Sequence, residues 1–263
     1  MQLPDVKAVV LDMDGVLWQD DQPLVDLPVV FAQMESLGWK ILFATNNSTR
    51  TPSFFAQKLK AMGVEAQPST ILTSSLATAY LLRKSFPRGG PIFLVGEDGL
   101  ETALKEAGFY HQEEEVIAVV AGMDRNLTYA KMSKATLHIR SGVPFFASNP
   151  DRTFPTPEGL LPGAGAVIAM LQAASDVDPI WAGKPNPTLY RMAMEQLDLH
   201  PNEVLAVGDR LETDILGGFR AGCPTALVCS GVSTRAMANA YQPRPTIIAK
   251  DLAELVTMYV KRR

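Results

Sequence analysis

Short apolar runs alternate with amphipathic segments along this chain, and the alternation predicts a parallel α/β fold. The first strand, predicted over residues 7–12, contains the continuous run Ala-Val-Val-Leu, which is typical of a strand buried on both faces. Apolar positions then recur at helical spacing over residues 27–37, and residues 39–44 form a second predicted strand. Helices are predicted over 52–62, which begins with Pro and stops at a Gly, and over 75–85. This order is typical of a parallel sheet with helices on its faces.

The segment at 87–91, Pro-Arg-Gly-Gly-Pro, interrupts this pattern, which then starts again. Beyond it we predict strands at 91–95, 116–121, 143–148, 203–207 and 225–229, and helices at 98–107, 128–140, 186–198, 213–221 and 251–260. We therefore expect an α/β core of residues 1–80 plus 182–263, with a Rossmann-like parallel sheet, and an inserted α/β domain over residues 81–181.

The composition is that of an ordinary globular protein and excludes several function classes. Of the 263 residues, 47% are hydrophobic and 20% are charged, and the net charge is −4. Such a chain lacks the broad basic surface that binds nucleic acid or an anionic membrane, but a metal and a few cations suffice for a small anionic substrate. No run approaches about 18 apolar residues and no secretory segment is recognisable, so we expect no membrane span. Cys223 and Cys229, the two cysteines, are expected to be reduced core residues of a cytoplasmic protein.

Two carboxylates stand at the exit of the first predicted strand. Asp12 and Asp14 are two residues apart, so an extended backbone turns both side chains to one side, and Gly15 then permits a sharp turn. Ligands of open α/β sheets bind just outside the carboxyl ends of the strands. A carboxylate pair there is costly unless a cation or a shared proton offsets the repulsion. The pair is therefore interpreted either as a binding site or as a solvated Asp turn.

Two more polar clusters carry candidate chemistry. Thr45 and Asn46 open the sequence Thr-Asn-Asn-Ser after the second predicted strand. Their hydroxyl and amide groups are neutral donors for an oxyanion, and an Asn-rich turn or a helix cap is the alternative. Lys184 lies between Gly183 and Pro185, and the proline biases it toward extended backbone. Such a lysine meets a phosphate or a carboxylate as a point charge, or it is simply solvated.

The fourth cluster follows the predicted strand at 203–207. Asp209 comes directly after Gly208 at the exit of this strand, and helix capping does not account for it. Thr213 is predicted to cap the next helix, with Asp214 in the first turn, where a carboxylate is favoured. A capping role and a role in a ligand site are both open for Asp214.

Together the four clusters resemble the haloacid dehalogenase superfamily of phosphotransferases. The shared motifs are Asp-x-Asp-Gly-Val, Thr-Asn-Asn, Gly-Lys-Pro and Gly-Asp-x-x-x-Thr-Asp, in the family's order, so the resemblance covers nearly the whole chain. The insertion, residues 81–181, resembles the large α/β cap of the subgroup that contains 4-nitrophenylphosphatases, phosphoglycolate phosphatases and NagD-type nucleotidases. Two further segments support it: Ser-Asn-Pro-Asp at 148–151, and Pro-Gly-Ala-Gly at 162–165 before a helix.

The resemblance implies roles for the carboxylates. Asp12 is the expected nucleophile, which forms an aspartyl-phosphate, and Asp14 is expected to protonate the leaving oxygen and then activate water. Mg²⁺ is the expected cofactor. The carboxylates of Asp12 and Asp209 and the backbone carbonyl of Asp14 are its expected ligands, with Asp214 supporting the metal or its waters. In this family, phosphatases and mutases carry the second aspartate, and this type of cap favours a phosphatase.

The resemblance also implies contacts to the phosphate and to the rest of the substrate. Thr45 and Asn46 are expected to bind phosphoryl oxygens, and Lys184 is expected to neutralise charge beside the nucleophile. The residues expected to contact substrate, or to dock the cap on the core, are Asn149, Asp151 and Arg152. A plain surface position is the alternative for Arg152.

We therefore expect a Mg²⁺-dependent phosphatase of small phosphomonoesters: a sugar phosphate, phosphoglycolate, a nucleotide monophosphate or 4-nitrophenyl phosphate. The alternative is a catalytically silent protein that keeps the fold for binding or regulation. The expected partner is a small phosphorylated metabolite, with no nucleic acid and no membrane. Caps of this type often mediate dimers in the family, which suggests a homodimer through the cap. The sequence does not single out one substrate.

Overall fold

The computed structural model describes residues 3–156 and 158–262 of the chain, which form two compact units. Unit 1 comprises Met1–Thr45, Pro52–Leu72 and Lys184–Arg263. Unit 2 comprises Asn46–Thr51 and Thr73–Gly183.

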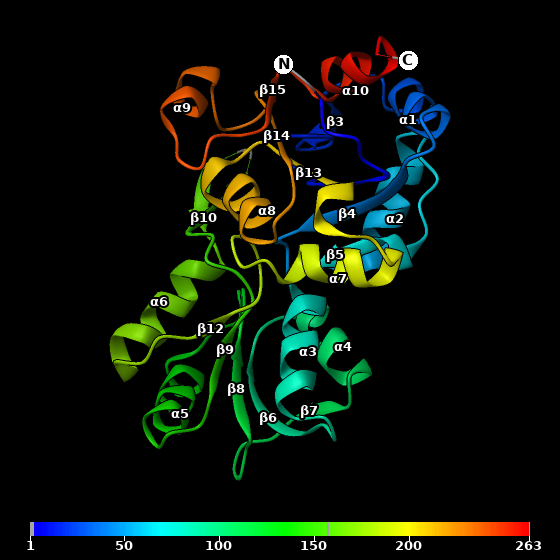
Figure 1. Cartoon of the computed structure of the whole chain (residues 1–263). Coiled ribbons are helices and arrows are strands. Elements are labelled where there is room, and N and C mark those ends of the chain that lie inside the picture. Colours follow the sequence, from blue (N-terminus) through cyan, green and yellow to red (C-terminus); the bar gives the residue numbers. More distant parts are fainter. Residues whose placement is uncertain (1–2, 157, 263) are drawn as a thin grey trace. The chain divides into compact units, whose positions relative to one another are not determined.

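A six-stranded sheet forms the centre of unit 1, in the order β15-β14-β13-β1-β4-β5 (Figure 1). Its strands are β1 (Ala8–Leu11), β4 (Lys40–Thr45), β5 (Ile71–Thr73), β13 (Val204–Gly208), β14 (Thr225–Val228) and β15 (Ile247–Ala249). β1 pairs in parallel with β4 and β13, with Leu11 opposite Phe43 and Val207. The strand order reverses between β1 and β13, so their carboxyl ends form a topological switch point, where ligands of such sheets bind.

Helices cover this sheet and bury the predicted apolar runs. They are α1 (Leu27–Ser36), α2 (Pro52–Ala61), α7 (Thr188–Leu197), α8 (Leu216–Arg220), α9 (Arg235–Ala240) and α10 (Leu252–Val260). Short helical turns lie at Pro68–Thr70, Pro201–Glu203 and Leu211–Ile215, and β2 (Trp18–Gln19) pairs with β3 (Gln22–Pro23) in a hairpin. Val9 and Leu11 of β1 share one buried cluster with side chains of α1, α2 and α10. All four residues of β1 are buried, as its continuous apolar run predicts.

Unit 2 contains a second parallel sheet, in the order β12-β9-β8-β6-β7. Its strands are β6 (Gly90–Val95), β7 (Phe109–His111), β8 (Ala118–Ala121), β9 (Phe145–Ala147) and β12 (Ile180–Trp181). Its helices are α3 (Ser74–Ser85), α4 (Asp98–Glu106), α5 (Tyr129–Arg140) and α6 (Ala164–Ser175), and β10 (Thr153–Thr156) pairs with β11 (Gly159–Pro162) in a separate antiparallel ribbon.

Each face of the unit 2 sheet has its own apolar core. Phe93 of β6 faces the cluster with α5 and α6, and its neighbour Leu94 faces the cluster with α3 and α4. This alternation follows from the period of two along a strand. Figure 1 accordingly shows α5 and α6 on one side of these strands and α3 and α4 on the other.

Helix α3 belongs to unit 2, whereas the predicted border placed residues up to 80 in the core. The reason is packing: Ala79 and Leu82 of α3 share a buried cluster with Ile92 and Leu94 of β6. The apolar spacing of a helix reveals that it has a buried face but not which sheet that face covers.

Most other predicted elements are confirmed, with ends that lie within two residues of those predicted. The strands that were not predicted have only two to four residues, too few to display a period of two. The helix predicted over 213–221 begins differently, because a π-helical turn at Leu211–Ile215 precedes α8. The Gly163 segment is confirmed as the N-terminal cap of α6.

Within residues 3–156 and 158–262, none of the helices has the length and apolar character that a bilayer crossing requires.

Two buried tyrosines of unit 1 allow a matched test of stability. The hydroxyl of Tyr190 donates to the backbone carbonyl of Asp214 at 3.1 Å, whereas the hydroxyl of Tyr259 is buried without a hydrogen-bond partner among the described residues. We expect Tyr190→Phe to lower the free energy of unfolding by about 1 kcal/mol, and Tyr259→Phe to leave it unchanged or raise it by up to about 1 kcal/mol. Urea unfolding measures both values, and equal losses would contradict the difference in hydroxyl pairing.

Candidate active site

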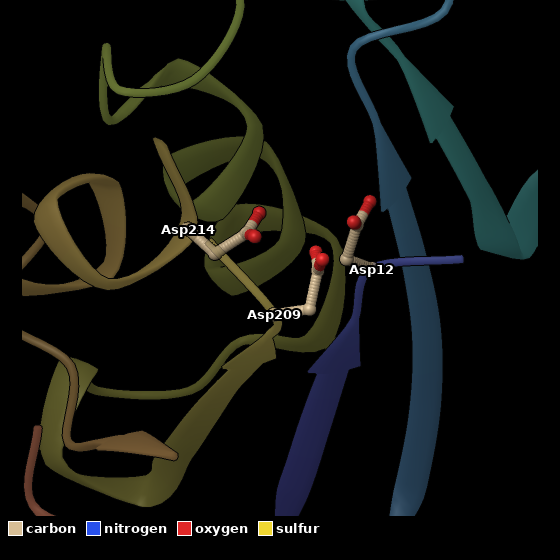
Figure 2. A group of neighbouring side chains, drawn as sticks. All are labelled: Asp12, Asp209 and Asp214. Carbon is tan, nitrogen blue, oxygen red and sulfur yellow. The ribbon is translucent and has the colours of Figure 1, made fainter. Parts of the chain in front are cut away.

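Three carboxylates meet at the switch point of the unit 1 sheet (Figure 2). Asp12 directly follows β1, Asp209 directly follows β13, and Asp214 lies in the π-helical turn after it. One oxygen of each carboxylate lies within 4.8 Å of an oxygen of the other two. Because β1 and β13 are parallel neighbours, their exits must lie side by side, and the sequence carries an aspartate at both.

A buried ammonium group, that of Lys184, faces this cluster. Lys184 is 2% exposed, and its Nζ lies 2.7 Å from Oδ1 of Asp12 and 2.7 Å from Oδ1 of Asp214. It also donates to the backbone carbonyl of Ala44 at 2.9 Å. Lys184 therefore offsets part of the negative charge, but one ammonium cannot balance three ionised carboxylates.

The carboxylate of Asp209 occupies a space that two glycines leave open. A Cβ atom on Gly15 would lie 2.5 Å from Oδ2 of Asp209, and one on Gly231 would lie 2.0 Å from it. The backbone N–H of Val232 donates to that oxygen at 2.7 Å. Oδ1 of Asp209 is buried without a hydrogen-bond partner among the described residues. A buried, unpartnered carboxylate oxygen beside two further carboxylates fits a hard divalent cation, which prefers oxygen ligands.

The ionisation of the cluster reflects the same excess of negative charge. Burial raises the pKa of Asp12 well above its usual range; Lys184 opposes this shift, and the charges of Asp214 and Asp209 add to it. Burial, helped by the charge of Asp214, also raises the pKa of Asp209 to about 7. Burial disfavours the charged form of Lys184, yet the carboxylates of Asp12 and Asp214 hold its pKa well above the usual lysine range. Without a cation the cluster thus retains protons that a metal ion would displace.

The backbone around Asp214 differs from the predicted helix cap. Oδ2 of Asp214 accepts the backbone N–H of Arg210 at 3.0 Å, and Arg210 is itself the cap residue of the π-helical turn. Thr213 is buried inside this turn, so the prediction that Thr213 caps the helix is wrong. The extra residue of a π-helical turn moves the helix start, which local sequence does not reveal. Asp214 keeps both of the roles left open, because it also pairs with Lys184.

Asp14 is exposed, but one of its oxygens is fixed. The indole Nε1–H of Trp18 donates to Oδ1 of Asp14 at 2.8 Å, and the backbone N–H of Gly15 donates to the carbonyl of Trp18 at 2.7 Å. Trp18 is fully buried. Sequence reasoning missed Trp18, and the available signal was an indole donor only four residues from a candidate catalytic carboxylate.

Unit 2 brings together three of the other predicted residues. The backbone carbonyl of Asn46 accepts the side-chain amide of Asn149 at 2.6 Å and the hydroxyl of Ser74, also at 2.6 Å. The side-chain amide of Asn46 donates to Oδ1 of Asp151 at 3.2 Å. Asn149 is buried, and its contacts hold the Asn46 segment in place within this unit. Sequence reasoning missed Ser74.

The two remaining predicted residues are Thr45 and Arg152. Thr45, the last residue of β4, is buried at the carboxyl edge of the unit 1 sheet. Arg152 is exposed in unit 2, and its backbone carbonyl accepts the N–H of Gly163.

Known proteins are similar to this chain in sequence and in fold. A family model for haloacid dehalogenase-like hydrolases matches residues 9–110, and a HAD-hydrolase-like model matches residues 181–255. The acid sugar phosphatase of Staphylococcus aureus is 38% identical over 251 residues, which are 95% of this chain and 96% of that protein.

Solved structures agree with these matches. The p-nitrophenyl phosphatase from Archaeoglobus fulgidus has a TM-score of 0.90 and 31% identity, covering 97% of this chain and 100% of that chain. The glycerol phosphate phosphatase from Mycobacterium tuberculosis, solved in complex with magnesium, has a TM-score of 0.89 and 33% identity, covering 95% of this chain and 76% of that chain. Likeness of this degree over nearly the whole sequence shows that the chain belongs to the family of haloacid dehalogenase-like hydrolases.

Proposed function

We propose that this chain is a Mg²⁺-dependent phosphatase that hydrolyses small phosphomonoesters through an aspartyl-phosphate. The observation that carries the proposal is the pairing of Lys184 with Asp12 inside a buried cluster of carboxylates at the sheet's switch point. The phosphatase names of the relatives support the reaction class. Sugar phosphates, phosphoglycolate, nucleotide monophosphates and 4-nitrophenyl phosphate are the substrate candidates.

Asp12 is the proposed nucleophile. A carboxylate oxygen of Asp12 attacks phosphorus, an acyl-phosphate bond forms, and the ester P–O bond breaks. Lys184 donates a hydrogen bond to Oδ1 of Asp12, which orients the carboxylate and favours its ionised form. Burial raises the pKa of Asp12 in the metal-free site, and a bound cation would favour the ionised carboxylate.

Asp14 is the proposed acid and base. It gives its proton to the leaving oxygen as the P–O bond breaks, and then accepts a proton from the water that attacks the acyl phosphate. The second step releases inorganic phosphate and restores the carboxylate of Asp12. A positioned acid and base of this kind usually contributes about 10²–10⁴-fold to the rate.

Mg²⁺ would be held by the carboxylates of Asp12 and Asp209 and by the backbone carbonyl of Asp14. Asp214 would support the ion or its bound waters without coordinating the ion directly. When bound, the ion offsets negative charge on the transferring phosphoryl group. The unpartnered Oδ1 of Asp209 supports this placement. Val232 and the two glycines beside Asp209 fix that carboxylate in the cluster before any ion binds.

Several finer predictions from the sequence are part of the proposal. Thr45 and Asn46 bind phosphoryl oxygens, and the cap over residues 81–181 contributes specificity or docking residues. Of these, Asn149 and Asp151 already engage Asn46, which leaves Arg152 as the exposed candidate. The cytoplasmic location and a homodimer through the cap stay predictions. The competing proposal is a catalytically silent member of the family.

Replacing the nucleophile tests the reaction directly. We expect Asp12→Asn to lower turnover of 4-nitrophenyl phosphate by at least about 10³-fold, because an amide has the size of the carboxylate but does not attack phosphorus. The control is Glu35→Gln on the exposed side of α1, which makes the same chemical change outside the cluster. Full activity in Asp12→Asn would contradict the role of Asp12 as the nucleophile. A wild-type protein that releases no phosphate from any substrate in a metabolite panel would support the catalytically silent alternative.

Binding of Mg²⁺ is testable without activity. In the metal-free protein the pKa of Asp209 is raised to about 7, so its contribution to the free energy of unfolding falls as the pH rises through about 7. Mg²⁺ competes with that proton, so we expect it to raise the Tm more at pH 8 than at pH 6. Asp209→Asn should remove most of this shift, and Glu35→Gln should keep it. Equal Mg²⁺ shifts in wild type and Asp209→Asn would show that Asp209 is not a ligand.

A further inference from the structure

Trp18 and Asp14 form a closed loop directly after the first strand. The indole Nε1–H of Trp18 donates to Oδ1 of Asp14 at 2.8 Å, while the backbone N–H of Gly15 donates to the carbonyl of Trp18 at 2.7 Å. Gly15 has a φ of +80°, a left-handed conformation that closes the loop without strain for glycine. The side-chain bond and the backbone bond together fix the direction of the Asp14 carboxylate.

The indole is held from the other side by a different element. Trp18 is fully buried and shares the apolar core of unit 1 with Met13 and Leu17. Nζ of Lys58, on α2, lies 4.6 Å from the centre of the Trp18 ring, a cation–π arrangement.

Lys58 also holds the tip of the hairpin that Trp18 begins. Its Nζ donates to the backbone carbonyl of Asp20 at 2.7 Å and pairs with Oδ1 of Asp21 at 3.0 Å. These two residues form the turn between β2 and β3. Helix α2 therefore clamps the hairpin and the indole together.

The chemistry of this hydrogen bond favours one oxygen of Asp14 as the site of its proton. An indole N–H donates and never accepts, so Oδ1 must be the acceptor in every protonation state of Asp14. When Asp14 is a carboxylic acid, its carbonyl oxygen accepts better than its hydroxyl oxygen, so this bond favours the proton on Oδ2. Asp14 is exposed, so this oxygen is available to a ligand.

We propose that Trp18 is a positioning residue for proton transfer, which holds the Asp14 carboxylate so that Oδ2 delivers the proton to the leaving oxygen, and that Lys58 supports it by fixing the indole. This inference rests on the proposed function. Trp18 acts through Asp14 and contacts neither the phosphorus nor the nucleophile, so its loss affects the proton-dependent part of the reaction most.

Substrates whose leaving groups differ in basicity distinguish a positioning role of Trp18 from a role in core packing alone. The leaving group of an alkyl phosphate such as glycerol phosphate is a strongly basic alkoxide, which needs a proton as it departs. The leaving group of 4-nitrophenyl phosphate is 4-nitrophenolate, which is stable without a proton. The value of kcat/KM reports the transfer of the phosphoryl group to the enzyme, when the leaving group departs. The ratio of kcat/KM for the two substrates is therefore the readout.

Trp18→Phe removes the donor and keeps most of the apolar ring. We expect kcat/KM for glycerol phosphate to fall by about tenfold or more and that for 4-nitrophenyl phosphate by less than about threefold, mainly through kcat in both cases. The matched control is Trp39→Phe. Trp39 is a buried tryptophan that immediately precedes β4. The first residue of β4 pairs with the first residue of β1, which is the end of that strand away from Asp12. We expect this control to lose similar stability and to leave the substrate ratio unchanged.

Two further variants keep the inference falsifiable if Trp18→Phe folds poorly. Lys58→Met retains the stem of the lysine and should shift the substrate ratio in the same direction by a smaller factor. In an Asp14→Asn background, Trp18→Phe should leave the ratio unchanged, because its effect passes through the lost acid. Equal losses for both substrates in Trp18→Phe, or an unshifted ratio in both Trp18→Phe and Lys58→Met, overturn the inference.

The outcome for wild type distinguishes this inference from the proposed function. If wild type hydrolyses both esters and the ratio does not respond to Trp18, the phosphatase proposal stands and the positioning role falls. If wild type releases phosphate from no ester in the metabolite panel, the proposed function fails and takes the positioning role with it.

Discussion

The excess of buried carboxylate over ammonium at one edge of a parallel sheet is the constraint on which this structure depends. Two unit charges about 5 Å apart repel by roughly 3 kcal/mol at an effective dielectric constant of about 20. Asp12, Asp209 and Asp214 approach one another this closely, and a whole domain is stable by only about 5–15 kcal/mol. Lys184 offsets part of this repulsion. The cluster is therefore costly for folding, and its persistence indicates a functional demand for bound positive charge.

The parallel topology makes this convergence possible. β1 and β13 are distant in the sequence but adjacent in the sheet, so one aspartate after each is enough to begin the cluster. Glycines then let the Asp209 carboxylate fit against the backbone, since a Cβ on Gly15 or Gly231 would overlap it. The rigid edge of the sheet thus fixes the donor atoms before any ligand binds, which is how a site limits the cost of ordering its groups.

The sequence predicted the parts of the site that depend on strand order and local motif. Local patterns placed Asp12 and Asp209 at strand exits and left Lys184 open; the three were predicted to act together because their motifs resemble those of the haloacid dehalogenase superfamily. The contacts of Ser74 and Val232 were not predicted, because each joins segments that meet only in the folded chain. The predicted border at residue 80 fell inside α3 for the same reason, since the apolar face of this helix fits either sheet until the packing is known.

Trp18 shows how a local sequence can conceal a chemical role. As a large apolar residue it matches the core of unit 1, and its burial is explained by packing alone. Its N–H nevertheless needs a partner when buried, and the partner it has is a carboxylate rather than a backbone carbonyl. A buried donor that is satisfied by Asp14 couples the stability of the hairpin to the orientation of that side chain. Core packing and the orientation of the Asp14 carboxylate then depend on the same side chain, and the contacts of Lys58 on α2 support both.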